Sequence, residues 1–502
     1  MKQRAKAELL KNTSVAYSKY LRNQPAIIHV NEEEKETKLS DASRDNPLQT
    51  TEDVNNAKSE EDKSRNILKI AAKKSPADPV LQRFLERKAD VQRVCDNRPE
   101  LQEITFPYTC GEEPRKAFLK QDTMPLMYCA IEKTGSTFWR RILQVAGGAS
   151  SGRPSLIRTM NAYNENGYHN MLNTPYKNIE ANFKTMTSIM FVRSPYQRLF
   201  SGWLDKMYSP NWIFWIVLGD EVVKTQRKVD HFKKHTCGYD ITFSEFIAHT
   251  VEDLIKKNCV NSHFTPSFYH CFPCIYDMDY IGKYETFKED TVYLTKKLNM
   301  SVVLDKFDHD ATTDAITDAV DFVYNERVDI VKCNVSFRCA LFKVWQRLKA
   351  RGIIGLDCEF PYKTDSEANK APYGDFYHRI VKANADSDKG ELKLNRKKAY
   401  VQAIRSLSDD LISKLAESFE VDFTMFGYDT DPLGSLSDID TSDATPVKDV
   451  ECNDLLGQRQ RCAYNSYKLE VPFPGSIAYL EDMVEHGARA HGRKLLLLSN
   501  RQ

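Results

Sequence analysis

The chain has 502 residues, of which 41% are hydrophobic, and it carries 71 Lys and Arg against 70 Asp and Glu. This apolar content suffices for a large core and excludes wholesale disorder. The formal net charge of +1 gives no global attraction for nucleic acid or acidic membranes, so any site for a polyanion must be local.

The first region of the chain is polar and charged. Residues 31–66 contain almost no large apolar side chains, and such a stretch cannot offset its ordering entropy by burial. The basic N-terminus lacks the apolar run of a signal peptide, and no stretch reaches the roughly 18 apolar residues that a membrane helix needs. We therefore expect residues 1–89 to be a charged, largely disordered, stalk-like region without a visible targeting segment.

One large domain is expected between residues 90 and 430. Apolar residues at helical spacing already begin at residues 80–94, and no repeat of 20–50 residues divides the chain beyond them. From Asp429 the sequence becomes acidic and rich in small residues, which is typical of a linker. We expect residues 431–502 to be an acidic linker and a C-terminal tail.

The first candidate site follows a predicted strand at residues 126–131. This apolar run leads into Lys133-Thr-Gly-Ser-Thr137, and residues 138–145 then show the apolar spacing of a helix. Backbone N–H groups and hydroxyls at the start of a helix bind phosphate, and Lys133 adds positive charge. Because Lys133 precedes Gly135, the Walker pattern is absent and an ordinary P-loop kinase is disfavoured. The alternative is a plain strand–helix turn with an exposed lysine.

The second candidate site begins at Arg193, which follows a predicted strand at residues 189–192. A helix is expected to start at Pro195, with Arg198 and Ser201 on one of its faces. Open α/β sheets bind ligands at the carboxyl ends of their strands, so Arg193 is expected to bind a second phosphate. Arg198 is equally compatible with a surface ion pair, and Ser201 with a small packing residue.

Cysteine usage favours an oxidising compartment. There are 12 cysteines, and several lie close together in the sequence. Three glycosylation sequons, at Asn12, Asn299 and Asn334, point in the same direction.

Five segments resemble motifs of the carbohydrate sulfotransferases, Golgi enzymes whose donor is 3′-phosphoadenosine 5′-phosphosulfate (PAPS). The segments KTGSTFWRRIL and FVRSPYQRLFSGWLDK resemble the family's 5′- and 3′-phosphosulfate-binding motifs. Three others resemble motifs of the chondroitin and dermatan 4-O-sulfotransferases: His263–Pro266 with Cys271–Cys274, Tyr280–Thr286, and Asp422–Tyr428. The resemblance spans roughly residues 90–430, in register, and implies an α/β, P-loop-like sulfotransferase fold with a central, mostly parallel sheet flanked by helices.

The resemblance implies a carbohydrate O-sulfotransferase that transfers a sulfuryl group from PAPS to a sugar hydroxyl of a glycosaminoglycan or a glycoprotein glycan, without a metal. Lys133 would stabilise charge on the bridging oxygen. The 5′-phosphosulfate would be held by Lys133, Thr134, Gly135, Ser136, Thr137 and Phe138, and the 3′-phosphate by Arg193, Arg198 and Ser201. A non-catalytic binding protein of the same fold and a nucleotide-dependent, kinase-like enzyme are the alternatives.

The acceptor hydroxyl needs a general base, for which histidine suits neutral pH. His169 is the first candidate, because it ends a polar loop that leads to the strand before Arg193. In this it resembles the catalytic histidine of the related 2-O-sulfotransferases. His263 is the competitor, with a structural role near the cysteines as its alternative, and Glu132 is the third candidate.

Three further expectations concern charge and metal. The family usually has proline where Glu132 stands, and this carboxylate should repel the phosphosulfate unless Arg140 or Arg141 neutralises it. The cluster Cys259, His263, His270, Cys271 and Cys274 can be read as a zinc site, but the resemblance favours disulfides. An acidic glycan would need a local basic groove, and the candidates are Arg153, Lys224, Arg227, Lys228, Lys233 and Lys234.

The resemblance also implies a location. Members of the family carry an N-terminal membrane anchor and work in the Golgi lumen, whereas this sequence shows no anchor. We therefore expect the N-terminus to be incomplete, with a diverged, soluble member as the alternative.

Overall fold

The computed structural model describes residues 78–103, 107–108, 114–121, 123–149, 152–227, 237–258 and 260–444. They all belong to the first of two compact units, residues 1–458. The second unit, residues 459–502, lies outside the described residues, as do most of the expected stalk (residues 1–77) and most of the expected tail (residues 445–502). The same is true of Asn12, Cys110, Lys228, Lys233, Lys234, Cys259, Cys452 and Cys462.

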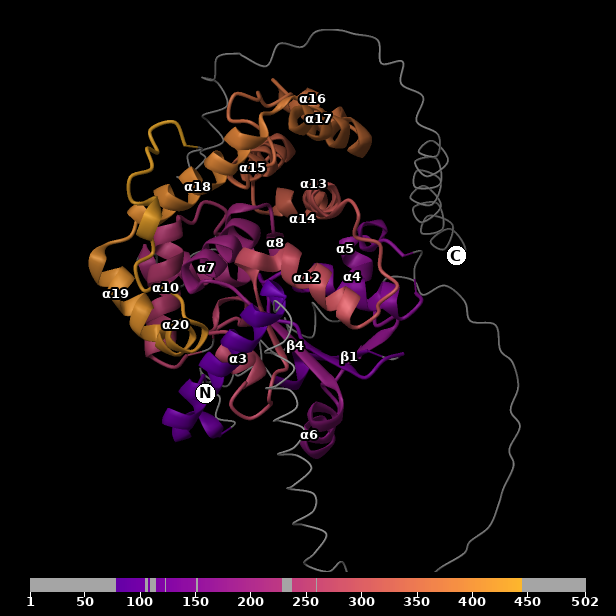
Figure 1. Ribbon diagram of the computed structural model, residues 1–502. Helices are drawn as coiled ribbons and strands as arrows, with labels where there is room; N and C mark the ends of the chain where they lie inside the picture. The colour runs from indigo at the N-terminus through magenta and orange to yellow at the C-terminus, as the bar shows by residue number, and fades with distance from the viewer. Residues whose placement is uncertain are drawn as a thin grey trace, which may run out of the picture. The chain divides into compact units, whose positions relative to one another are not determined.

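A five-stranded sheet lies at the centre of the described residues, with the strand order β3-β1-β2-β4-β5 (Figure 1). The strands are β1 (Phe118–Gln121), β2 (Leu126–Cys129), β3 (Tyr168–Asn170), β4 (Thr187–Val192) and β5 (Tyr280–Lys283). β2 pairs with β4 and β4 with β5 in parallel, whereas β1 is antiparallel to both β2 and β3. Four of the five strands therefore run in one direction, because only β1 is reversed. The expected α/β fold with a mostly parallel sheet is confirmed.

Helices pack on both faces of the sheet. The α-helices are α3 (Pro79–Asn97), α4 (Ser136–Ala146), α5 (Thr159–Ala162), α6 (Tyr176–Thr185), α7 (Pro195–Trp203), α8 (Trp212–Phe214), α9 (Asp220–Gln226), α10 (Phe243–Ile255), α11 (Phe268–Cys271), α12 (Phe287–Lys297), α13 (Phe307–Asn325), α14 (Arg327–Lys332), α15 (Phe337–Ala350), α16 (Asp365–Lys370), α17 (Tyr373–Asp386), α18 (Lys389–Arg405), α19 (Asp409–Ser418) and α20 (Glu420–Phe426). Two π-helical turns, η4 (Leu204–Tyr208) and η5 (Trp215–Gly219), interrupt the stretch between α7 and α9. Short 3-10 helices are η1 (Pro99–Gln102), η2 (Pro114–Lys116), η3 (Pro154–Leu156), η6 (Ser262–Phe264), η7 (Tyr284–Thr286) and η8 (Gly434–Leu436).

Successive side chains of β2 and β4 point to opposite faces of the sheet, so the core has one layer on each face. Met127 and Met190 pack in a cluster that includes residues of α3, α6 and α20. Tyr128 and Ile189 point to the other face, into a cluster with residues of α4 and α12. Strands covered on both faces are expected to be apolar throughout, and every residue of β2 is indeed buried.

The described chain after residue 300 is helical, and part of it forms a separate core cluster. Residues of α13, α15 and α17 pack together with Trp215 of η5, and α15 is buried over almost its whole length. In Figure 1 the helices α15 to α18 lie together, beyond α7 and α10. Among the described residues, none of the helices is both long and apolar enough to cross a membrane.

Three disulfides join distant parts of the described chain: Cys95–Cys274, Cys129–Cys271 and Cys237–Cys333. Cys339 is also disulfide-bonded, and Cys358 is a buried free thiol. The expectation of disulfides is thus confirmed, and two members of the cysteine–histidine cluster, Cys271 and Cys274, are used in them. No group of three or more His, Cys, Asp or Glu in the described part of the chain is arranged to hold a metal ion.

Candidate active site

The two predicted phosphate-binding segments meet at one edge of the sheet. β2 and β4 are parallel neighbours, and both strands are followed by a helix, α4 and α7 respectively. Because the carboxyl ends of parallel strands share an edge, the residues that leave them lie close together. The Arg193 guanidinium accordingly donates from Nη1 to the carbonyl oxygen of Lys133 across 3.4 Å.

The loop after β2 has a left-handed backbone at two positions. Lys133 has φ of 67° and Gly135 has φ of 94°. A Cβ on Gly135 would lie 2.4 Å from the Phe287 ring, so this position requires glycine. Gly135 is the N-cap of α4 and provides no side-chain cap, so the cap residue leaves the backbone N–H groups of the first turn for other partners.

The remaining predicted donor-binding residues of this loop have different surroundings. The Thr134 hydroxyl is buried and donates to the Ile131 carbonyl across 2.9 Å, so it braces the loop itself. Thr137 shares a hydrogen bond of 3.1 Å with the Tyr163 hydroxyl at an exposed position. The Phe138 side chain is buried and its ring packs 5.1 Å from that of Phe307, so only its backbone belongs to the site.

Lys133 lies in a cluster of charges. Its Nζ is 2.8 Å from Oδ2 of Asp205, which also lies 3.3 Å from Nζ of Lys206, and Oδ1 of Asp205 is 2.6 Å from Nη2 of Arg347. Burial lowers the pKa of the Lys133 ammonium to about 8, although Asp205 opposes the change. Burial acts to raise the pKa of Asp205, but the three cations outweigh it and hold that pKa well below its ordinary value.

Arg193 offers a second cationic group. Its guanidinium stacks 4.2 Å from the centre of the Tyr284 ring, and burial lowers its pKa. Its Nε is buried and has no hydrogen-bond partner among the described residues. A buried, unpartnered donor beside a helix start fits an anionic ligand such as a phosphate group.

Arg198 and Ser201 lie on α7, which begins at Pro195 as predicted. The Arg198 side chain is fully buried, and it donates to the carbonyls of Glu132 (2.9 Å), Thr265 and Ser262 (3.1 Å). Its guanidinium is therefore committed to backbone carbonyls under the loop. Ser201 is half-buried one turn further along the helix.

The three candidate bases occupy different places. His263 belongs to η6, and its Nδ1 lies 2.8 Å from Oδ1 of Asn261. Burial, together with the positive charges of Lys206 and Lys133, lowers the pKa of His263 well below 6.5. The Phe214 ring lies near both His263 and Lys206, at 5.5 Å from the His263 ring and 5.2 Å from Nζ of Lys206.

His169 and Glu132 point elsewhere. His169 is exposed on β3, the outermost strand, and pairs with Lys120, which itself pairs with Met127. His169 is therefore level with the middle of β2, two strands away, and not with the end of β2 where Lys133 lies. The Glu132 carboxylate accepts from the Ser262 hydroxyl across 3.2 Å. The structure thus brings His263 into the charge cluster around Lys133 and leaves His169 outside it.

Sequence reasoning missed Asp205 and Arg347. Asp205 carried a signal, since it follows Ser201 by four residues and so shares its helical face. Arg347 carried none, because it is 214 positions after Lys133 and only tertiary packing of α15 against η4 brings it close.

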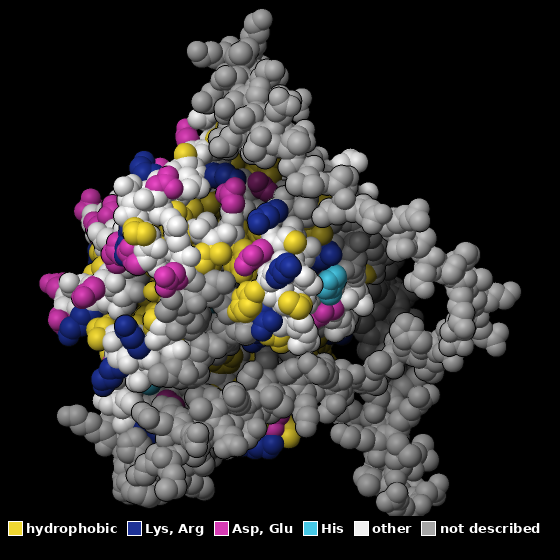
Figure 2. All heavy atoms as spheres, turned by 90° about the horizontal axis from the view of Figure 1, so that it is seen from below, with side chains coloured by type: hydrophobic (Ala, Val, Ile, Leu, Met, Phe, Trp, Pro, Cys, Tyr) yellow, Lys and Arg dark blue, Asp and Glu magenta, His cyan; other side chains and the backbone are white. Residues whose placement is uncertain are grey.

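The described candidates for a basic groove are engaged in ion pairs. Arg153 pairs with Asp305, Lys224 with Asp220, and Arg227 with Asp240 and Glu245. The face in Figure 2 likewise shows Lys and Arg interspersed with Asp and Glu. Because each of these cations already has a carboxylate partner, these residues do not mark a groove for a polyanion.

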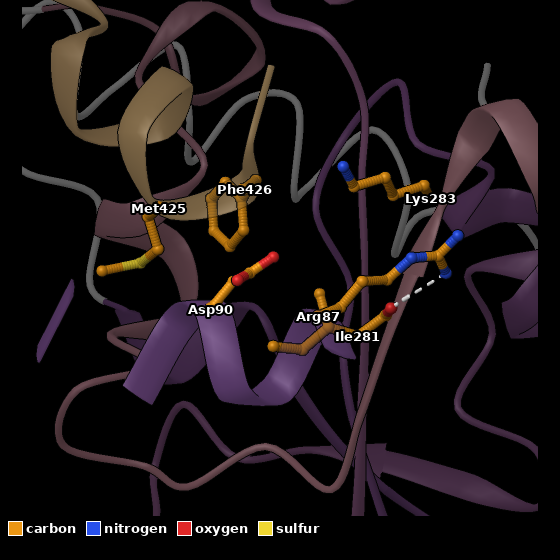
Figure 3. A pocket seen from close by; sticks show the side chains of 6 residues that line it. All are labelled: Arg87, Asp90, Ile281, Lys283, Met425 and Phe426. Atoms are coloured by element: carbon orange, nitrogen blue, oxygen red, sulfur yellow. Dashed lines mark hydrogen bonds between the residues drawn. The ribbon is translucent and has the colours of Figure 1, made fainter. Parts of the chain in front are cut away.

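A pocket lies between α3, β5 and α20, lined by Arg87, Asp90, Ile281, Lys283, Met425 and Phe426 (Figure 3). The Arg87 guanidinium donates to the Ile281 carbonyl, to Asp290 and to the Thr286 hydroxyl. The Lys283 ammonium lies 4.5 Å from the centre of the Tyr428 ring. None of the predicted site residues lines this pocket.

Comparison with known proteins places the site in a family context. Residues 116–317 match the model of the Sulfotransferase family. The chain is 29% identical to carbohydrate sulfotransferase 9 of Homo sapiens over 178 residues, which are 36% of this chain and 40% of the relative. It is 28% identical to carbohydrate sulfotransferase 11 of Rattus norvegicus over 196 residues (38% and 55%), and 25% identical to carbohydrate sulfotransferase 14 of Danio rerio over 216 residues (42% and 56%). The chain thus spans about half the length of the curated relatives it matches, and no solved structure matches it. The resemblance found in the sequence is confirmed.

Proposed function

We propose, from the premise that residues 116–317 belong to the sulfotransferase family, that this protein transfers a sulfuryl group from PAPS to a hydroxyl of a glycan. One observation carries the proposal. Two cationic strand ends meet on neighbouring parallel strands, with Arg193 bonded to the backbone of Lys133. A ligand with two separated phosphate groups, such as PAPS, would satisfy both ends at once.

The donor would lie across this edge of the sheet. Backbone N–H groups at the start of α4, with the Ser136 and Thr137 hydroxyls, would receive the 5′-phosphosulfate. Arg193 would receive the 3′-phosphate through its unpartnered Nε, and Ser201 lies on the helix that follows. Arg198 is assigned a positioning role here, because its donors already bind carbonyls beneath the loop.

Lys133 would stabilise the charge that develops on the oxygen between phosphorus and sulfur. The transferring group is loose and anionic, so catalysis rests on charge stabilisation and positioning. Lys133 must be protonated for this role, and Asp205 favours its protonated form. Asp205 is therefore a positioning residue for the Lys133 ammonium.

His263 is proposed as the general base. Oδ1 of Asn261 accepts a hydrogen bond from Nδ1 of His263, which assigns the proton of the neutral ring to Nδ1. The lone pair on Nε2 is then left for the acceptor hydroxyl. Its lowered pKa keeps the ring neutral at physiological pH. His169 is ranked below it because it lies on the outermost strand of the sheet.

A luminal location in the Golgi and N-glycosylation accompany this proposal. Disulfides persist in oxidising compartments, and three join described cysteines. The sequon residues Asn299 and Asn334 are both exposed, with left-handed backbone at the ends of α12 and α14. The acceptor is proposed to be a glycosaminoglycan or a glycoprotein glycan.

Two measurements test the proposed function. In thermal-shift titration, adenosine 3′,5′-bisphosphate should stabilise the protein whereas ATP with Mg²⁺ should not, and the reverse result would favour the kinase-like alternative. Radiolabelled sulfate should then pass from PAPS to desulfated chondroitin, desulfated dermatan or N-glycans, with Lys133→Ala as the inactive control. Donor binding without transfer to any acceptor would favour a non-catalytic binding protein.

A further inference from the structure

Glu132 contacts the segment of residues 262–270 through its side chain. Oε1 accepts from the Ser262 hydroxyl across 3.2 Å, and Oε2 lies 3.6 Å from Nδ1 of His270. Arg140 and Arg141 do not neutralise this carboxylate as the sequence suggested. Arg140 donates to the Tyr168 hydroxyl, and Arg141 pairs with Asp314 and Asp318 on α13.

The backbone of Glu132 is tied to the same segment. Its carbonyl accepts from Nε of Arg198 across 2.9 Å, while Nη2 of Arg198 donates to the Ser262 carbonyl across 3.1 Å. Arg198 is fully buried, so this guanidinium is a bridge between the two stretches of chain. The disulfide Cys129–Cys271 joins them again just outside the bridge.

These contacts surround a strained residue. Lys133 follows Glu132 directly and has φ of 67°, a left-handed conformation that is unfavourable for a residue other than glycine. Such a conformation persists only where neighbouring contacts determine it. Glu132 fixes the chain on one side of Lys133, and Arg193 holds the Lys133 carbonyl on the other.

The negative charge of Glu132 lies close to the positive charge of Arg198. It favours the charged form of Arg198, whose pKa burial lowers. The Glu132 carboxylate accepts from Ser262 and lies beside His270, and the Arg198 guanidinium, which is bonded to the Glu132 carbonyl, adds positive charge nearby that opposes the repulsion of an anion at the start of α4. The replacement of proline by glutamate is therefore compatible with donor binding.

We propose that Glu132 is a positioning residue that latches the loop carrying Lys133 to the segment carrying His263. The inference deepens the proposed function, on which it rests. Together with Arg198 and the Cys129–Cys271 disulfide, the Glu132 side chain would set the distance between the ammonium that stabilises the leaving group and the ring that takes the acceptor proton. A misplacement of about 1 Å between such groups costs up to about 100-fold in rate.

The test compares Glu132→Ala, which removes the latch, with Glu132→Gln, which keeps an acceptor for Ser262 and removes the charge. With the acceptor that the wild type sulfates, Glu132→Ala should lower kcat by about 10- to 100-fold and change the KM for PAPS by less than about threefold. Glu132→Gln should stay within about threefold of the wild type in both. The matched control is Glu252→Ala, which removes an exposed carboxylate on α10 that pairs with Lys256.

Two results would contradict the positioning role of Glu132. One is an unchanged kcat in Glu132→Ala. The other is Glu132→Gln binding adenosine 3′,5′-bisphosphate about tenfold more tightly than the wild type, which would mean that the carboxylate repels the donor. If Glu132→Ala does not fold, Ser262→Ala removes the same hydrogen bond from the other side and should show the same split between kcat and KM.

Hydrogen exchange separates this inference from the proposed function. Without any ligand, the amides of residues 131–137 should exchange faster in Glu132→Ala than in the wild type or Glu132→Gln, because the strained loop loses its support. Equal exchange in all three proteins would refute the latch. A wild type that neither binds the bisphosphate nor transfers sulfate would instead refute the proposed function, and the exchange result would still decide the latch.

Discussion

Substitution of Asp205 by asparagine should move the alkaline limit of activity. The Asp205 carboxylate lies 2.8 Å from the Lys133 ammonium, and the two side chains are only 23% and 18% exposed, so solvent screens the pair incompletely. An opposite charge at this range typically changes a pKa by about 1–3 units. The pKa of Lys133, about 8 in the wild type, should therefore fall to about 5–7 in Asp205→Asn.

The consequence for the rate follows from the protonated fraction of Lys133. At pH 7.5 a group with a pKa of about 8 is about three-quarters protonated, whereas a pKa of about 7 leaves about one quarter and a pKa of about 5 less than about 1%. Transfer at pH 7.5 should thus fall by at least about threefold. If the pKa of Lys133 falls only to about 7, the rate should largely recover at about pH 6, where Lys133 is again mostly protonated. His263 stays neutral there because its pKa is held well below 6.5.

The assay is a profile of kcat/KM against pH for sulfate transfer by the wild type and Asp205→Asn. The matched control is Asp220→Asn, which removes a buried carboxylate paired with Lys224 on α9, away from the site. Thermal unfolding should be recorded alongside, because Arg347 also loses its partner in Asp205→Asn and one broken buried pair can cost about 3–5 kcal/mol. A variant whose rate falls equally at every pH, with its alkaline limit still near 8, would refute the electrostatic role of Asp205.

Other outcomes are expected at separate sites. His263→Ala should lower kcat by about 100- to 10,000-fold and His169→Ala by less than about threefold, so equal losses in transfer assays would contradict the choice of base. In protein secreted from eukaryotic cells, Asn299→Gln and Asn334→Gln should each abolish one glycan detected by glycosidase treatment. A wild type without glycans would argue against passage of the protein through the secretory pathway. The change in melting temperature caused by Asp314→Asn should be more favourable at pH 8 than at pH 5. Burial raises the pKa of the Asp314 carboxyl from 3.8 to about 7, so its ionisation destabilises the native state increasingly as pH rises through that window. A melting-temperature difference that does not depend on pH would contradict this origin.

The sequence was sufficient for the elements that carry the donor site. Apolar runs before Lys133 and Arg193 predicted β2 and β4, and Pro195 marked the start of α7. These signals are local, since they depend on strand burial and helix-start chemistry. Ser194 occupies the N-cap position of α7 and makes no side-chain cap.

The sequence was insufficient where side chains choose among distant partners. Arg198 was expected at the ligand, but burial turned its donors to the carbonyls of Glu132, Ser262 and Thr265. His169 looked favourable because it precedes the strand of Arg193, yet its own strand joins the far edge of the sheet. Strand order and helix packing determine where these two side chains lie, and neither has a signature in the spacing of residues.

The charge cluster around Lys133 extends beyond the part of the chain that matches the family. Arg347 lies on α15, after residue 317, where the match ends. It shares Asp205 with Lys133 and, being positive, also lowers the pKa of Lys133 directly. A helix from the less similar part of the chain therefore helps to set the pH range over which Lys133 is charged. Because Arg347 and Lys133 share the Asp205 carboxylate, any change in the packing of α15 on η4 should alter the proton affinity of Lys133.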